Sequence, residues 1–167
     1  MVNSLFRMLL LRSLTALTVP ILVVIFVTLW LLNVYPMGAP NVLVQFFGGL
    51  LIAFGFAFAA WCMLLFFDIG RGTIMPWDPT QKLVAVGPYQ YVRNPMITGV
   101  IGMVAGEALF FGSTAIGILA TIFFAINHVY FIYSEEPGLE IRFGESYREY
   151  KRNVPRWISR TKPYKPK

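Results

Sequence analysis

Four apolar runs dominate the chain, and short polar stretches separate them. A helix needs about 20 apolar residues to cross roughly 30 Å of hydrocarbon, and residues 13–33, 42–67, 95–111 and 114–133 approach or exceed that length. The pattern therefore predicts an all-α integral membrane protein with four transmembrane helices over these ranges.

The first apolar run has a competing interpretation. Arg7 and Arg12 precede it, as basic residues precede the apolar part of a secretory signal peptide. The run is longer than the roughly 7–15 apolar residues of such a peptide, and no cleavage site of small residues follows it. We therefore interpret residues 13–33 as a membrane span.

Two polar stretches interrupt the apolar pattern. The first is QKLVAVGPYQYVRNPMI at 81–97, with the Gly-Pro of a turn at 87–88 and the Asn-Pro of a capped helix start at 94–95. The second is SEEP at 134–137, directly after the last apolar run. We expect the two stretches to fold together and to hold one small charged ligand.

The third apolar run contains a stripe of small residues and a carboxylate. Gly99, Gly102 and Gly106 give it one smooth face. Such faces let helices approach closely in a membrane, so we predict helix packing there, with a cofactor lying against the face as the alternative. Glu107 is the one acidic residue within this run, and we predict that it pairs with another side chain or reaches the membrane surface.

Beyond residue 137, apolar residues recur at spacings of three and four, which is typical of an amphipathic helix. The charged residues of this region occupy the opposite face. The sequence therefore predicts a C-terminal amphipathic helix whose apolar stripe either lies on the membrane or folds over the polar loop of residues 68–93. The stripe consists of Leu139, Phe143, Tyr147, Tyr150 and Val154.

Composition agrees with a single membrane-embedded domain over residues 1–167. Only 13% of the residues are charged and 57% are hydrophobic, whereas about 25% of the residues of soluble domains are charged. One histidine and one cysteine leave no cluster of metal ligands, so we expect no metal site. The sequence pI of 9.7 is typical of nucleic-acid binding, but the positive charges lie beside apolar runs, so we expect no nucleic-acid partner.

The positions of the basic residues predict the orientation in the membrane. All 14 Lys and Arg residues lie before the first run, in the 68–93 loop or in the tail from Arg142. Basic residues favour the cytoplasmic side. We therefore predict a multi-pass protein of the inner (cytoplasmic) cell membrane, with the loop and both termini in the cytoplasm.

Two motifs then point to a family. The chain contains GPYQYVRNP at 87–95 and EEPGLEIRFGESYREYKRNVPR at 135–156, one at each end of a hairpin of apolar runs. Together they resemble the isoprenylcysteine carboxyl methyltransferase and phospholipid methyltransferase superfamily, over a core of about 72–160. The resemblance implies that S-adenosylmethionine is the methyl donor and S-adenosylhomocysteine the product. It also implies an acceptor such as a prenylated cysteine carboxylate, a phosphatidylethanolamine amine or a small thiol.

The resemblance further implies which residues contact the cofactor. Residues 93–97 stand where the family has Arg-His-Pro-x-Tyr, so Asn94 replaces the histidine and Ile97 the tyrosine. Glu135 matches the family's cofactor-binding glutamate. The implied cofactor-binding residues are Gln81, Lys82, Leu83, Val84, Gly87, Tyr89, Asn94, Pro95, Met96, Ile97 and Glu135.

The residue types suit this chemistry independently of the resemblance. Glu135 or Glu136 can pair with the ammonium group of S-adenosylmethionine, and Arg93 or Lys82 with its carboxylate. We predict Glu136, Arg93 and His128 as catalytic residues, with Glu136 or His128 accepting the proton that an amine acceptor must lose. For His128, a hydrogen bond between helices is the alternative.

The sequence leaves open which group accepts the methyl group and whether the protein is catalytic. We expect methyl transfer to a membrane lipid or lipophilic small molecule through an amine, thiol or carboxylate group. Carboxyl methyltransferases carry an arginine four residues before the cofactor-binding glutamate, and Phe131 stands there, which disfavours the carboxylate. A non-catalytic binding or assembly subunit of the same family is the main alternative, favoured by Asn94 and Ile97. A small transporter is disfavoured by the single intramembrane acid, and the sequence does not indicate the oligomeric state.

Overall fold

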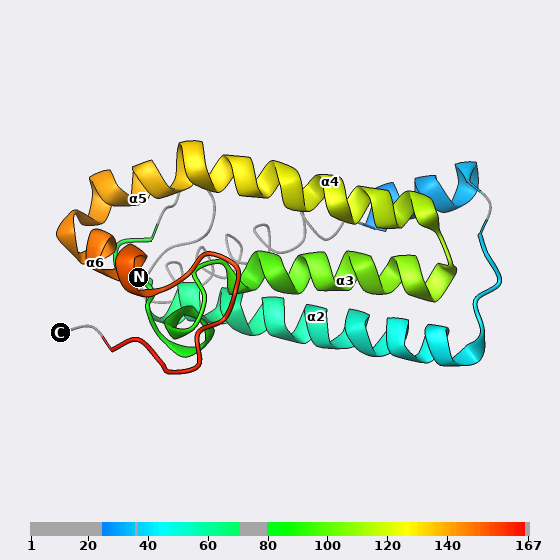
Figure 1. Ribbon diagram of the computed structural model, residues 1–167, viewed down its shortest axis with the longest axis horizontal. Helices are drawn as coiled ribbons and strands as arrows, with labels where there is room; N and C mark the ends of the chain where they lie inside the picture. The colour runs from blue at the N-terminus through cyan, green and yellow to red at the C-terminus, as the bar shows by residue number, and fades with distance from the viewer. Residues whose placement is uncertain (1–24, 36, 71–79, 166–167) are drawn as a thin grey trace, which may run out of the picture.

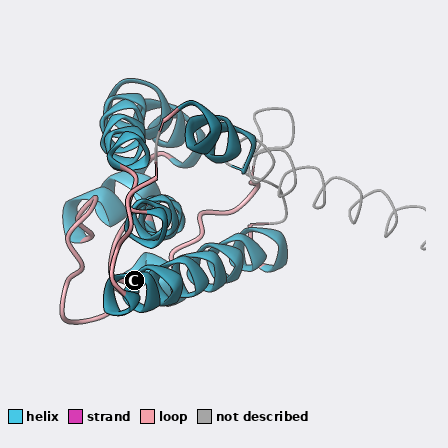
Figure 2. Cartoon of the chain, turned by 90° about the vertical axis from the view of Figure 1, so that its right-hand side faces the viewer, coloured by secondary structure: helices cyan, strands magenta, loops and turns pink. Residues whose placement is uncertain are grey.

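The computed structural model describes residues 25–35, 37–70 and 80–165. Every regular element in these ranges is helical (Figure 2). Three long helices, α2 (Val42–Asp68), α3 (Pro95–Phe111) and α4 (Thr114–Tyr130), run side by side (Figure 1). The prediction of an all-α chain is therefore confirmed for the described residues.

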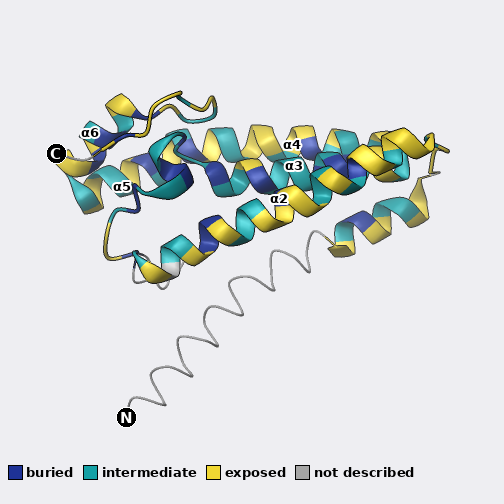
Figure 3. Ribbon diagram, turned by 90° about the horizontal axis from the view of Figure 1, so that it is seen from below, coloured by how far each residue is buried: buried dark blue, intermediate teal, exposed yellow. Residues whose placement is uncertain are grey.

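Two helical stretches, Val42–Phe66 and Thr114–Phe143, are long and apolar enough to cross a membrane. Ile25–Val34 and Pro95–Phe111 are shorter apolar helices, and the larger part of the first predicted span lies outside the described residues. The outer faces of the helices expose large apolar side chains, as contact with lipid requires (Figure 3). The structure thus supports two full-length candidate spans in the part of the chain that it describes.

The predicted smooth face of the third run packs against α2. A Cβ atom added at Gly55 would lie 2.6 Å from the carbonyl oxygen of Gly99, and one added at Gly48 would lie 2.9 Å from that of Gly106. Real Cβ atoms do not approach backbone so closely, so glycine is required where the two helices meet. Helix packing is therefore confirmed, and α2 occupies the face on which a cofactor was the alternative. Gly102 makes only an ordinary contact with Leu51.

Glu107 is paired inside the helical assembly. Thr28, in the helix Ile25–Val34, donates a hydrogen bond from its hydroxyl to Glu107 Oε2 at 2.7 Å. The Thr28 side chain is buried, so the bond joins this helix to α3 in an apolar setting. The predicted structural pairing of Glu107 is thus what the structure shows.

The fourth helix continues beyond the predicted span of residues 114–133. The helix continues through a π-helical turn, η2 (Phe131–Glu135), into α5 (Glu136–Phe143). In the wide turn the Glu136 N–H donates to the Phe131 carbonyl five residues earlier. Pro137 has no N–H to donate four residues back, and a π turn is one way in which a helix accommodates such a proline.

The predicted C-terminal amphipathic helix is two helices in the structure. α5 ends at Phe143, and α6 (Glu145–Asn153) follows it in a new direction (Figure 1). Between them Gly144 has a φ of 56°, a left-handed value that glycine adopts without a steric cost. The prediction of one continuous helix was therefore wrong, because the spacing of the apolar residues does not reveal a change of direction at a single glycine.

The apolar stripe of this region folds over the loop. Tyr147, Tyr150 and Val154 form a buried cluster with Ala85 of the loop and Tyr164 of the tail, and Leu83, Leu139 and Phe143 pack against it. Backbone hydrogen bonds from Arg160 N–H to Tyr91 O and from Tyr164 N–H to Gln90 O hold the tail beside the loop. Of the two predicted positions for the stripe, the structure has the one over the loop.

Candidate functional site

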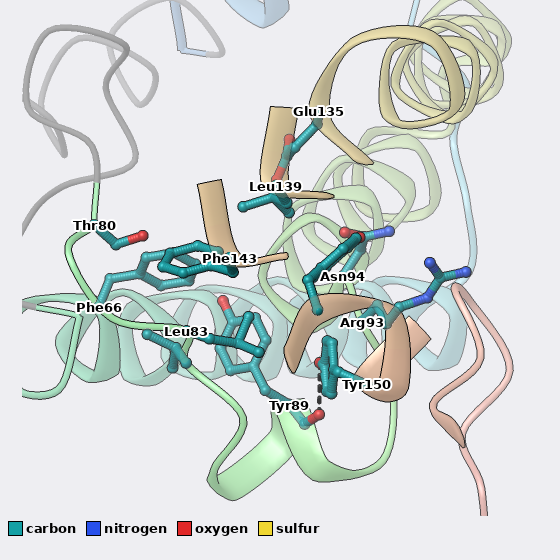
Figure 4. Close-up of a pocket in the computed structure, with 12 residues that line it drawn as sticks. Phe66, Thr80, Leu83, Tyr89, Arg93, Asn94, Glu135, Leu139, Phe143 and Tyr150 are labelled. Atoms are coloured by element: carbon teal, nitrogen blue, oxygen red, sulfur yellow. Dashed lines mark hydrogen bonds between the residues drawn. The ribbon is translucent and has the colours of Figure 1, made fainter. Parts of the chain in front are cut away.

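The two predicted polar stretches meet at a cavity. It lies at the end of the molecule where the loop, η2, α5 and α6 converge (Figures 1 and 4). Its volume is about 50 Å³. The lining residues are Phe66, Thr80, Leu83, Val84, Tyr89, Arg93, Asn94, Glu135, Leu139, Phe143, Tyr147 and Tyr150.

Tyr89 anchors the loop side of the cavity. It lies in the short 3₁₀ helix η1 (Gly87–Gln90), the turn predicted from Gly-Pro, and its ring packs edge-on against Phe66 at 5.3 Å. The hydroxyl of Tyr150 donates to the Tyr89 carbonyl oxygen at 2.7 Å, a bond drawn in Figure 4. A buried hydrogen bond of this kind fixes the loop to α6. The cavity wall is therefore shared by two segments some sixty residues apart.

Asn94 starts α3 but does not cap it with its side chain. Its carbonyl oxygen accepts hydrogen bonds from the backbone N–H and the hydroxyl of Thr98, and no side-chain capping bond forms. The predicted Asn cap was therefore wrong, because the backbone of Asn94 has φ −120° and ψ 53° rather than extended angles. The amide instead lines the cavity (Figure 4).

Glu135 is the acidic residue of the cavity wall. Burial, together with the smaller effect of the negative charge of Glu136, raises the pKa of its carboxyl group to about 7 against the opposing charge of Arg142. A carboxyl group with this pKa gains or loses its proton near neutral pH. Glu135 can therefore bind a cation in its charged form, and the binding will depend on pH.

Glu136, the next residue, is buried in a cluster of positive charges. Arg156 Nε lies 2.7 Å and Arg93 Nη1 2.9 Å from its Oε1, while Lys151 Nζ lies 3.2 Å from its Oε2. Its side chain is only 5% exposed. Burial alone would raise the pKa of Glu136, but the hydrogen bond from Arg156 and the charges of Arg93 and Lys151 lower it overall. Glu136 thus stays ionised and joins the loop, α5, α6 and the tail.

Arg93 connects this cluster to the cavity. Its side chain is 10% exposed. Although Nη1 is within ion-pair distance of Glu136, the angle is not that of a hydrogen bond, and neither Nε nor Nη1 has a hydrogen-bond acceptor among the described residues. A buried donor without an acceptor costs roughly 1–3 kcal/mol or more when charged, so such a group is suited to an anionic ligand.

His128 lies outside the cavity wall. Its Nδ1 accepts a hydrogen bond from Nε1 of Trp157 at 2.9 Å, and its ring stacks near Phe124. With Nδ1 accepting, the neutral ring carries its proton on Nε2 and has no free basic nitrogen. His128 therefore makes a hydrogen bond, the structural role that was predicted as the alternative. Its partner is Trp157 of the tail and not a residue of another long helix.

The other residues that the resemblance implied divide into two groups. Leu83 and Val84 line the cavity, as Tyr89, Asn94 and Glu135 do. Gln81 and Lys82 are exposed, and their backbone N–H groups donate to the Gly70 carbonyl at the end of α2. Gly87, Pro95, Met96 and Ile97 are not among the lining residues; Met96 packs instead beside Val84 and Tyr89 on Cys62.

Several site residues had no role in the sequence-based prediction. Tyr147 and Tyr150 were expected only as members of an apolar stripe, yet both line the cavity. Arg156 and Trp157 contact Glu136 and His128 from the tail. Arg156 is the last residue of the second motif, but neither the motif nor the helical spacing predicted a role for it or for Trp157, so only the fold reveals these contacts.

Comparison with known protein families identifies the family of this chain. The family model described as phospholipid methyltransferase matches residues 43–146, which is more than half of the chain. Comparisons with curated proteins and with solved structures gave no match. The matched range begins in α2 and ends at the start of α6, so it contains the lining residues from Phe66 to Phe143 but not Tyr147 and Tyr150. The chain therefore belongs to the phospholipid methyltransferase family, whose members are S-adenosylmethionine-dependent methyltransferases.

Proposed function

We propose that this protein transfers a methyl group from S-adenosylmethionine to a lipid or lipophilic acceptor at the cytoplasmic face of the membrane. The observation that carries the proposal is the cavity between the two motifs, whose lining residues include the acidic Glu135 and the largely buried Arg93. Opposite charges at one small cavity suit a ligand with an ammonium and a carboxylate group.

The lining residues fit the parts of this cofactor. Glu135 is suited to its ammonium group, and Arg93, with two buried donors lacking an acceptor, to its carboxylate. Leu83 and Val84 offer apolar surface for the adenine. Lys82, the other predicted partner of the carboxylate, is exposed and outside the wall. The cavity of about 50 Å³ is smaller than the whole cofactor, so we expect Leu139 and Phe143 of α5 to move on binding.

Methyl transfer requires mainly that the protein hold the methyl donor and the acceptor in a reactive geometry. When bound, S-adenosylmethionine supplies an activated methyl group that a nucleophile takes by in-line displacement. Holding two reactants in a reactive geometry supplies up to roughly 7–11 kcal/mol of the barrier reduction. Glu136 has a lowered pKa and cations on both oxygens, and Nδ1 of His128 is occupied, so neither is suited to accept a proton. We therefore assign Glu136 to organising Arg93, which is the residue suited to contact the ligand.

The acceptor is best sought among uncharged or amine groups. Phe131, which stands where carboxyl methyltransferases carry an arginine, is 4% exposed and packs on Trp157 at 5.6 Å. It offers no charge to an acceptor carboxylate. An amine, a thiol or a neutral lipid group is therefore favoured.

We further propose four spans in one domain, with the cavity and both termini on the cytoplasmic side. Residues 80–93 of the loop, α5, α6 and the tail lie at one end of the helices, and the uncharged residues 37–41 and 112–113 lie at the other (Figure 1). Cytoplasmic ends of membrane helices are rich in Lys and Arg. This arrangement agrees with the inner membrane as the location.

A non-catalytic relative remains the second candidate. Asn94 and Ile97 replace the family's histidine and tyrosine, and Ile97 does not line the cavity. Such a subunit would bind the cofactor without turnover, which separates it from the enzyme by experiment.

The test is cofactor binding followed by turnover. Titration calorimetry of the detergent-solubilised protein with S-adenosylmethionine should show binding that Glu135→Ala abolishes and that Glu145→Ala, at an exposed acidic residue of α6, leaves intact. Methyl transfer is then measured across a panel of amine, thiol and prenylcysteine lipids. Absence of cofactor binding by the wild type rejects the proposal, and binding without turnover on any lipid favours the non-catalytic subunit.

A further inference from the structure

Three consecutive residues of the tail each contact a different element of the site. The Pro155 carbonyl accepts a hydrogen bond from the Arg93 backbone N–H of the loop at 2.9 Å. Arg156 Nε donates to Glu136 Oε1, at the start of α5, at 2.7 Å. Trp157 Nε1 donates to His128 Nδ1, on α4, at 2.9 Å. A segment of three residues therefore joins the loop, α5 and α4.

We propose that Pro155, Arg156 and Trp157 form a clip that holds Arg93 ready for an anionic group, with Arg156 and Trp157 as positioning residues. The proposal rests on the proposed function, because the anionic group is taken to be the carboxylate of the cofactor's amino-acid part.

The argument for Arg156 rests on Glu136, the carboxylate that both arginines approach. Arg156 Nε donates a hydrogen bond to Glu136 Oε1 at 2.7 Å, and Arg93 Nη1 lies 2.9 Å from the same oxygen in an ion pair. A carboxylate oxygen has two lone pairs, so the two arginines can share it. Arg156 therefore fixes the carboxylate with which Arg93 is paired, while Nε of Arg93 has no hydrogen-bond acceptor among the described residues. Arg156 thus holds Arg93 in place for a ligand.

Trp157 anchors the clip. Its ring lies 4.9 Å from that of Phe124 and 5.6 Å from that of Phe131, and its N–H is bonded to His128. An indole that is packed on aromatic rings and hydrogen-bonded has little freedom to rotate. The neighbouring Arg156 is therefore held at a constant distance from α4 and from Glu136. This gives His128 a role as an anchor point.

The experiment compares two ligands that differ in the amino-acid part. S-Adenosylhomocysteine has the carboxylate and the ammonium, while methylthioadenosine has neither. We expect Arg156→Ala to weaken binding of S-adenosylhomocysteine by about 10-fold or more, the effect of losing one charge-assisted hydrogen bond, and to leave methylthioadenosine binding unchanged. Arg156→Lys should restore most of the affinity. Trp157→Phe, which keeps an aromatic ring and removes the N–H, should selectively weaken the binding of S-adenosylhomocysteine, but by less than Arg156→Ala does.

The matched control is Arg152→Ala, an exposed arginine of α6 whose partner is Glu145. It should bind both ligands as the wild type does. Equal weakening of both ligands by Arg156→Ala, or no rescue by lysine, would overturn the proposal, because a loss of fold or packing would give that result. Unchanged binding of S-adenosylhomocysteine by Arg156→Ala and Trp157→Phe would overturn it as well.

A second measurement separates this proposal from the proposed function. If the wild type binds neither ligand, the function is rejected, and the clip is then tested by hydrogen exchange of residues 87–94. The Arg93 N–H is bonded to Pro155, so Arg156→Ala and Trp157→Phe should speed exchange in this segment relative to Arg152→Ala. Identical exchange in all four proteins would reject the clip itself.

Discussion

The raised pKa of Glu135 predicts a defined pH dependence of cofactor binding. In the free protein the carboxyl group has a pKa of about 7, mainly because it is buried. A bound ammonium group favours the charged form, so binding must remove the proton at any pH below that value. The affinity for S-adenosylhomocysteine should therefore be constant just above pH 7 and fall as the pH is lowered.

The magnitude follows from the ionised fraction. About half of a group with a pKa near 7 is ionised at pH 7 and about 1% at pH 5, so the dissociation constant should rise about 50-fold between pH 7 and pH 5. Above roughly pH 8 the ligand's own amino group loses its proton, which limits the useful window to pH 5–7.5. Titration calorimetry in buffers of different ionisation enthalpy would also count the released proton.

The matched variant is Glu135→Gln, which keeps the shape of the side chain and cannot ionise. It should bind S-adenosylhomocysteine weakly at pH 7, with a dissociation constant that barely changes down to pH 5. Glu140→Gln, which removes a carboxylate outside the cavity wall, should keep the wild-type slope. A wild-type dissociation constant that is flat from pH 5 to pH 7, or a slope retained by Glu135→Gln, would refute the role of Glu135.

The remaining predictions concern stability, measured by thermal unfolding in detergent. Glu135→Gln should raise the unfolding temperature of the unliganded protein at pH 8 but not at pH 4. The pKa of Glu135 is raised in the folded state, so the charged carboxylate costs stability as the pH rises through about 7. An equal effect of the substitution at both pH values would contradict this. Glu136→Gln should destabilise by about 3 kcal/mol, because buried cations lose their counter-charge, while Glu145→Gln at an exposed pair should change the free energy of unfolding by less than about 1 kcal/mol. Gly55→Ala should destabilise the protein by about 1–3 kcal/mol, because the new methyl group would clash with α3. Gly138→Ala should not destabilise it, because open space surrounds Gly138. Similar effects at the two glycines would count against the close packing of α2 and α3.

The helices of this protein could be predicted because their signals are local. Apolar runs bounded by polar stretches gave α2, α3 and α4 with nearly correct ends. The glycine stripe of the third run likewise predicted packing, because small side chains permit close approach whichever helix is the neighbour. The meeting of the two polar stretches was also predictable, since two helices joined by a short turn bring the chain back to the same end of the molecule.

The different roles of the adjacent residues Glu135 and Glu136 could not be predicted from the sequence. Glu135 lines the cavity and Glu136 lies in a cluster of cations, and this difference depends on the π turn and on the tail residues that fold back. Asn94 was expected to cap a helix because of its residue type, but its backbone angles prevent it. In each case contacts made across the fold decide the role, and a single sequence does not contain them.

The place of the clip in the chain has a consequence for biosynthesis. Chains grow from the N-terminus, and domains begin to fold in that order. Residues 155–157 follow every helix of the structure, so the hydrophobic segments can enter the bilayer before Arg156 exists to neutralise Glu136. A nascent chain that has reached Asn153 would contain every helix that the structure describes but not the contacts of residues 155–157 with the candidate site. Activity should therefore be acquired only after these last contacts have been translated, and not during insertion.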